Sequence, residues 1–226
     1  MIFKTIDFHL YTNYSNVDYS YAVKLKTKHI CNYIERNCLK PLKFQTKDNQ
    51  GIIIGFRHGY NDATDSTFEP KISPTNRVSC TLAFDKEKYD RQKTDNDYRE
   101  FCLESLLQAF ETAKGKYEIP TTEILESFEE LRQNNFVNEW LHKKKAVKTK
   151  KILVELHCAM TIDQFQLTLK VSQNNKEIYK KVILETDPDE FAFQYKLGDI
   201  LVDDEAIIIT TKTKKELYKL SFSELV

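Results

Sequence analysis

Residues 95–117 read DNDYREFCLESLLQAFETAKGKY, and this stretch decides the architecture of the amino-terminal part of the chain. Its apolar side chains recur at helical spacing, which predicts a long amphipathic helix near 95–115. Asp95 and Asp97 lie in the first turn, where the helix dipole favours negative charge. Gly115 is placed to end the helix. The apolar stripe comprises Tyr98, Phe101, Cys102, Leu106, Ala109, Phe110, Ala113 and Tyr117.

A second amphipathic helix is predicted near residues 122–141, with Thr121 or Thr122 as its cap. The apolar pattern continues past Asn134-Asn135, which weakens the helix without ending it. Two adjacent helices with a short connection should pack as a helical hairpin. The apolar positions are Ile124, Leu125, Phe128, Leu131, Phe136, Val137, Trp140 and Leu141.

The segments before this hairpin combine strands with a further helix. A strand is expected at residues 2–11 because its apolar residues alternate, and a helix is expected near 19–38. Residues 52–54 and 78–84 are rich in β-branched and aromatic side chains, as strands usually are. This mixture is typical of an α/β arrangement.

From Ile152 the hydrophobic period changes to two, which predicts an antiparallel sheet with one solvated face. Asn174-Asn175 lies between two alternating runs, as a hairpin turn would. The fold class is therefore α+β: an α/β amino-terminal domain with a helical hairpin at 1–145, then an antiparallel β-rich domain at 146–226. The basic segment at 142–151 marks the expected boundary.

Charge is distributed in blocks along a chain whose net charge is zero. Residues 85–131 contain 7 Lys or Arg and 13 Asp or Glu, whereas residues 132–151 contain 7 and 1. Such blocks can steer a charged partner. The best candidate surface is the outer side of the second helix, with a second acidic candidate in the loop after residue 58. The partner-binding candidates are Glu123, Glu126, Glu129 and Glu130, with Asp62 and Asp65.

The basic run at residues 143–151 has two interpretations. Runs of this kind can bind the phosphates of nucleic acids. Alternatively, the run forms the basic end of the second helix and complements its carboxy-terminal dipole and the acidic block before it. The second interpretation is favoured because the chain is neutral and no aromatic side chain interleaves with the lysines. Nucleic acid is therefore not the expected partner.

The cysteine and histidine patterns give no metal motif. The five cysteines are scattered without a Cys-x-x-Cys pair, and the five histidines are isolated. The amino terminus lacks the apolar core of a signal peptide, and no apolar run approaches a membrane span. We therefore expect a cytoplasmic protein without a cofactor, metal or membrane association.

The most enzyme-like segment runs from Gly55 to Asp65. His58 could act as a base there, oriented by Asp62 or Asp65. The function that such a site would serve is that of a hydrolase acting on a nucleotide or phosphoester. The more common explanation is a long polar loop with glycines at positive φ, and we favour it because the spacing fits no phosphate-binding motif. His157 and Cys158 cannot pair, because neighbours in a strand point to opposite faces.

One part of the chain resembles a known group of proteins. The residues are Phe84-Asp-Lys-Glu-Lys-Tyr89, a polar spacer, Tyr98 to Phe110, and Tyr117-Glu-Ile-Pro-Thr-Thr-Glu123. Within residues 84–140, about a quarter of the chain, this order resembles immunity proteins of bacterial polymorphic toxin systems. The resemblance implies a cytoplasmic α+β protein that binds and blocks one toxin domain. It carries over no individual site residue, and it does not cover the β-rich part.

The leading hypothesis is therefore a non-enzymatic inhibitor that binds a bacterial toxin, with no small-molecule substrate. The alternatives that remain open are the hydrolase using the His58 loop and a nucleic-acid-binding protein using residues 143–151.

Overall fold

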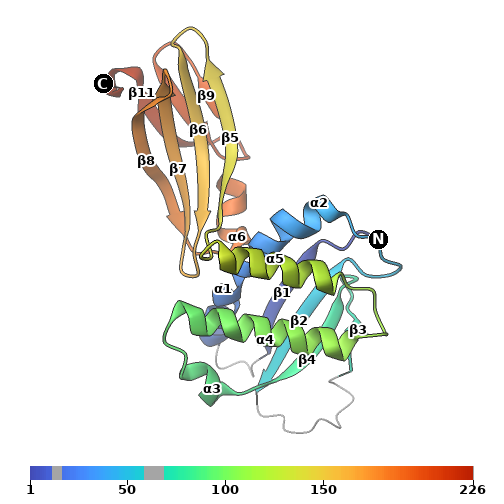
Figure 1. Ribbon diagram of the computed structural model, residues 1–226. Helices are drawn as coiled ribbons and strands as arrows, with labels where there is room; N and C mark the ends of the chain where they lie inside the picture. The colour runs from blue at the N-terminus through green and yellow to red at the C-terminus, as the bar shows by residue number, and fades with distance from the viewer. Residues whose placement is uncertain (12–16, 59–68, 226) are drawn as a thin grey trace. The chain divides into compact units, whose positions relative to one another are not determined.

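The computed structural model describes residues 1–11, 17–58 and 69–225 and confirms the α+β fold (Figure 1). The chain divides into two compact units, Met1–Phe136 and Val137–Val226. The sequence placed this division between residues 145 and 146. Each unit has its own hydrophobic core, so each is described by itself.

The first unit is built on a four-stranded sheet in the order β1-β2-β4-β3. The strands β1, β2 and β4 are parallel, and Phe8, Ile54 and Cys80 lie in one register row. The short edge strand β3 is antiparallel. The bounds are Thr5–Tyr11 for β1, Gly51–His58 for β2, Lys71–Ile72 for β3 and Val78–Phe84 for β4.

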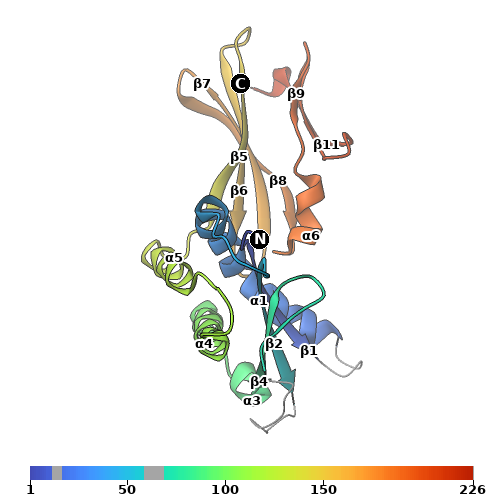
Figure 2. The ribbon, with the colours of Figure 1, turned by 90° about the vertical axis from the view of Figure 1, so that its right-hand side faces the viewer.

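Helices of the first unit enclose one face of this sheet. Figures 1 and 2 show α4 and α5 side by side over that face. The first helix continues into a π-helical turn and then into α2, so the helical run does not stop before Pro41 as the sequence suggested. The helices are α1 (Val17–Ile34), the π-helix η1 (Glu35–Leu39), α2 (Lys40–Leu42), α3 (Lys86–Asp90), α4 (Asp95–Ala113) and α5 (Thr121–Gln133).

The core of the first unit lies between the sheet and these helices. Every second residue of β1 is buried, as the alternating sequence predicted. Phe56 of β2 packs against Phe101 of α4 with ring centroids 5.1 Å apart, and Phe84 and Tyr89 extend this aromatic cluster. Burial of these rings, rather than helix propensity, fixes α4 on the sheet.

The other face of the sheet carries polar side chains held by an ion triad. Asp7 of β1 pairs with Lys28 of α1 at 2.9 Å and with Arg77 just before β4. Burial opposes ionisation of Asp7, but the charges of Lys28 and Arg77 outweigh it and lower its pKa. Gly55 leaves room for the Tyr11 ring, because a Cβ there would lie 2.3 Å from that ring. The triad therefore ties α1, β1 and β4 together.

The second helix of the hairpin ends earlier than the sequence predicted. The prediction of helix at residues 122–141 is wrong beyond Gln133, because Asn135 and Phe136 adopt positive φ angles of 51° and 58°. The Phe136 N–H donates to Leu131 O at 2.8 Å, and the Asn135 N–H donates to Arg132 O at 3.0 Å. This is the Schellman arrangement that closes helices.

The second unit is all antiparallel, as predicted from Ile152 onward, and consists of two sheets around one core. The first sheet has the order β5-β6-β7-β8 and the second β11-β10-β9. Phe193 stacks on Phe165 with centroids 3.8 Å apart inside this core. The strands are β5 (Glu139–Val147), β6 (Ile152–Met160), β7 (Phe165–Gln173), β8 (Lys176–Thr186), β9 (Ile200–Val202), β10 (Ala206–Thr210) and β11 (Glu216–Ser221), with short helices α6 (Glu190–Phe193), η3 (Gln194–Lys196) and η4 (Phe222–Glu224).

Two sequence features of this unit have clear structural roles. Asn174 and Asn175 form the turn between β7 and β8 with φ of 51° and 63°, which confirms the predicted hairpin. The basic run, in contrast, forms strand β5 and the following turn, so its interpretation as a helix end is wrong. Lys143 and Lys214 both pair with Asp199, and their hydrogen bonds lower its pKa to about 2.

His29 of α1 provides a test of how the helices of the first unit are held. It is 2% exposed, and its Nε2 lies 3.0 Å from Phe136 O, so the ring donates this proton. Burial, aided by Arg99, lowers its pKa to about 4. Because the unfolded chain binds the proton more tightly, stability should fall as pH drops from about 6.5 towards 4, by roughly 2 kcal/mol.

Urea unfolding of the full chain across this pH range should show that slope, and His29→Gln should reduce it, while His9 and His142, whose pKa values burial also lowers, keep a part of it. His157→Gln on the outer side of β6 is the control and should keep the wild-type slope. An unchanged slope in His29→Gln would contradict the assignment.

Candidate functional site

The candidate surface is formed by α4 and α5, which lie side by side (Figure 2). Arg132 of α5 bridges the two helices, because its guanidinium lies 2.6 Å from Glu100 of α4 and 3.1 Å from Glu129. Its guanidinium also lies 5.4 Å from the centroid of the Phe128 ring. The hairpin predicted from the sequence thus has a defined polar bridge at one end.

The four predicted glutamates of α5 separate into two groups. Glu129 is neutralised by Arg132, whereas Glu123, Glu126 and Glu130 form no ion pair with any residue in the described part of the chain. Glu126 and Glu130 are exposed and Glu123 is half-buried. We call Glu123, Glu126 and Glu130 the acidic stripe of α5.

The acidic stripe raises the pKa of Cys38, which lies in the π-helix η1 beside α5. The Cys38 thiol donates to Glu123 O at 3.4 Å. Burial raises the pKa of this thiol, and the charges of Glu123, Glu130 and Glu126 raise it further. Glu129 has no part in this effect. Cys38 is therefore a poor nucleophile, and its pKa reports the negative charge of the acidic stripe.

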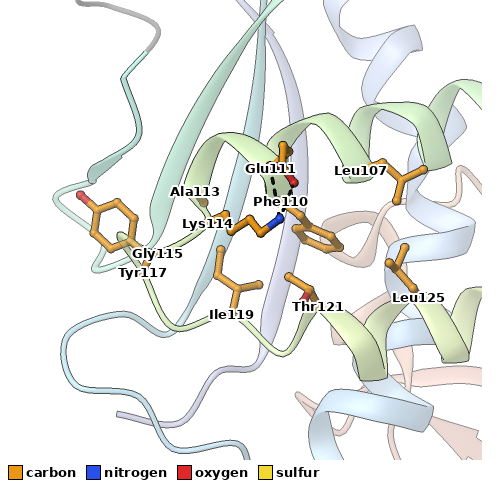
Figure 3. A pocket seen from close by; sticks show the side chains of 10 residues that line it. All are labelled: Leu107, Phe110, Glu111, Ala113, Lys114, Gly115, Tyr117, Ile119, Thr121 and Leu125. Atoms are coloured by element: carbon orange, nitrogen blue, oxygen red, sulfur yellow. Dashed lines mark hydrogen bonds and ion pairs between the residues drawn. The ribbon is translucent and has the colours of Figure 1, made fainter.

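An open groove of about 370 Å³ lies between the end of α4 and the start of α5 (Figure 3). Phe110 lies among the lining side chains, and Leu107 and Leu125 line the groove from α4 and α5. Glu111 and Lys114 pair at 3.2 Å on its rim. The other lining residues are Ala113, Gly115, Tyr117, Ile119 and Thr121.

Leu107 was not among the residues that the sequence singled out. It is 47% exposed, although it follows the fully buried Leu106. The helical period places two consecutive leucines on different sides, so only one can belong to the core stripe. The adjacent Leu106 and Leu107 in the sequence therefore indicated that one leucine of this helix would be exposed.

Most of the enzyme-like segment lies outside the described residues. Strand β2 continues to His58, whose side chain is not described, and Asp62 and Asp65 fall in the part that is not described. Gly55 lies within β2 instead of in a loop, so the predicted positive φ at this glycine is wrong. Cys80 pairs with Ile54 in register, and its thiol donates to Ala109 O at 3.6 Å. Burial raises the Cys80 pKa to about 12, so Cys80 is a buried residue of the hydrophobic core and not a nucleophile.

The other candidates from the sequence were the His157–Cys158 pair, a metal site and a membrane span. The Cys158 side chain is buried while that of His157 lies on the other face near Glu155, which confirms that they do not pair. Within residues 1–11, 17–58 and 69–225, no group of three or more His, Cys, Asp or Glu could hold a metal ion. No helix in the same ranges combines the length and apolarity needed to cross a membrane.

Comparison with known proteins found no matching family model, curated protein or solved structure.

The field of the acidic stripe can be measured through Cys38. In the variant Glu123→Gln/Glu126→Gln/Glu130→Gln, the Cys38 pKa should fall, because three negative charges near the thiolate are removed. The pH at which neutral iodoacetamide alkylates Cys38 should then shift downward, read by mass spectrometry of the Cys38 peptide. The single variant Glu129→Gln is the matched control and should leave the profile unchanged. Equal shifts in both variants would contradict the division of the glutamates.

Proposed function

We propose that this protein is a non-enzymatic inhibitor that binds another protein through α4 and α5, and that its partner is a bacterial toxin domain. The observation that carries the proposal is the acidic stripe, whose three carboxylates have no cation partner among the described residues. The resemblance of residues 84–140 to immunity proteins supports the class of partner.

Unpaired carboxylates on a chain with zero net charge favour a cationic partner. On α4, in contrast, Glu104 is matched by Lys88 at 2.8 Å and Glu100 by Arg132. Charges left over at one exposed face raise the rate of encounter with a basic partner but add little affinity by themselves. The affinity must come from apolar contacts.

The nucleic-acid alternative loses support from the environment of the basic run. The Lys145 ammonium donates to Ile200 O at 3.1 Å, and Lys143 binds Asp199. Two of the lysines proposed to bind phosphate are thus engaged within the second unit. The hydrolase alternative depends on residues 58–68 and gains no support from the described residues.

Neutralisation in cells tests the proposal. The carboxy-terminal domain encoded by the open reading frame adjacent to this gene is expressed from an inducible promoter, and growth is recorded with and without this protein. Growth arrest by that domain, with recovery when the full chain is co-expressed, is the expected result. Arrest without recovery, together with no complex on size-exclusion chromatography, would reject the proposal.

The variant Glu126→Lys/Glu130→Lys should slow association with the purified toxin domain by roughly tenfold at low salt, with a smaller effect at high salt. Stopped-flow or surface plasmon resonance measures this rate. The control Glu185→Lys/Glu216→Lys makes the same charge change at exposed sites of the second unit and should associate at the wild-type rate. Equal slowing of both variants would show a global charge effect.

A further inference from the structure

The outer face of the β5–β8 sheet is open, and its side chains form rows across the four strands. The second sheet of this unit covers the other face (Figures 1 and 2). The register aligns one residue from each of β5, β6, β7 and β8, and every side chain in the rows is exposed or half-buried. The rows are Glu139–Ala159–Gln166–Glu185 (the acidic row), Leu141–His157–Thr168–Val182 (the central row) and Lys144–Glu155–Lys170–Lys180 (the basic row).

Two β-bulges give the rows this alignment. The register skips His142 in β5 and Ile183 in β8, so both edge strands contain one extra residue between neighbouring rows. The bulge at His142 turns Lys143 inward to Asp199 and Lys144 outward. The central row therefore lies about 7 Å from the acidic row on one side and about 7 Å from the basic row on the other.

Most charges of this face are unmatched within the chain. Glu185 accepts a hydrogen bond from Gln166 at 2.6 Å, which leaves its charge in place. Lys170 lies directly opposite Lys180, and like charges at opposite positions destabilise a sheet. The basic row stays positive, since Glu155 is its one carboxylate. The side chains that form no ion pair with any residue that the structure describes are Glu139, Glu185, Lys144, Lys170 and Lys180. Such a local conflict indicates a surface that meets a partner.

A two-fold axis along the central row makes this face complementary to itself. The axis reverses the strand direction of a second copy, so the acidic row of that copy lies over the basic row of the first. Lys144 then meets Glu139 of the second copy, and Lys180 meets Glu185 of the second copy. In a two-fold interface each of these contacts occurs twice.

The charges exclude the other axis that would stack two copies of this face. An axis parallel to the strands places the basic row on itself, so Lys144 would face Lys180 of the second copy, and the two acidic rows would also meet. Like charges across an interface suppress association. The charge pattern therefore selects a single arrangement.

We infer that the outer face of the β5–β8 sheet is the interface of a homodimer, in which the acidic row of each copy lies over the basic row of the other. The strands of the two copies run antiparallel, and the sheets stack about 10 Å apart, as aligned sheets do. The inference goes beyond the proposed function, because it involves the second unit and not α4 or α5.

The size of the face fits a weak but specific dimer. The nine residues of β5 span about 30 Å, and four strands about 4.8 Å apart span roughly 19 Å. Two such faces together bury about 1,100 Å², near the lower limit for a specific interface. Leu141 and Val182, which are 42% and 39% exposed, supply apolar contacts at the axis. The charged rows fix the orientation of the two copies.

Sedimentation equilibrium of the full chain between about 1 µM and 1 mM tests the dimer. The mass should rise with concentration from 26.6 kDa to twice that value. Glu139→Lys and Lys144→Glu should each raise the dissociation constant by about tenfold or more, because each places like charges at both symmetric contacts. An equimolar mixture of these two variants should dimerise again, because each contact in the mixed dimer joins opposite charges.

The apolar contact is tested separately. Leu141→Ser should raise the dissociation constant by about tenfold, because the leucine is buried in both copies of the dimer. Leu201→Ser on β9, where the leucine is 46% exposed, is the matched control and should dimerise as the wild type does. Glu216→Lys and Lys219→Glu make the matched charge changes at exposed positions of β11 and should also have no effect.

Three results would overturn the inference. The first is a mass of 26.6 kDa at every concentration. The second is a dimer that Glu139→Lys, Lys144→Glu and Leu141→Ser leave intact, since its interface would then lie elsewhere. The third is a mixture of the two charge variants that stays as monomeric as either variant alone.

Discussion

Phe136 fixes the arrangement of the helices in the first unit, and the candidate surface depends on that arrangement. Its N–H closes α5 on Leu131, and its carbonyl accepts the proton of the buried His29 of α1. Its ring lies 4.1 Å from the guanidinium carbon of Arg99 on α4 and packs edge-on against Phe128. One residue in a left-handed conformation thus contacts three helices. These contacts hold the end of α5 against α1 and α4.

The sheet explains why this helix pair is the exposed functional candidate. Three parallel strands bury one face under the helices, while the Asp7, Lys28 and Arg77 triad occupies the other. The aromatic cluster around Phe56 uses the inner side of α4, and the buried residues of α5 use its inner side. The outer sides remain, with carboxylates in excess and one exposed leucine. Core packing therefore selects which residues of a charged helix are available to a partner.

The sequence predicted the parts of the fold that depend on local periodicity. The α4 helix, strand β4 and the Asn174-Asn175 hairpin follow their patterns closely. The end of α5 could not be predicted, because Val137, Trp140 and Leu141 fit a helical stripe as well as a strand, and only the left-handed Asn135 and Phe136 decide. The sequence identified the candidate glutamates of α5, but it did not show which of them are ion-paired. Arg132 neutralises Glu129 because of how the side chains are placed in the folded protein. The groove depends on the distance between two helices, which no spacing encodes.

We propose that α4 and α5 form the face that binds a protein partner. Hydrogen–deuterium exchange of the full chain, measured by mass spectrometry with and without the proposed partner, tests this assignment. Binding through this face should slow exchange in peptides that cover residues 103–119 and 121–133 and leave exchange in β5 to β8 unchanged. Protection confined to the second unit or to the polar face of the sheet would contradict it.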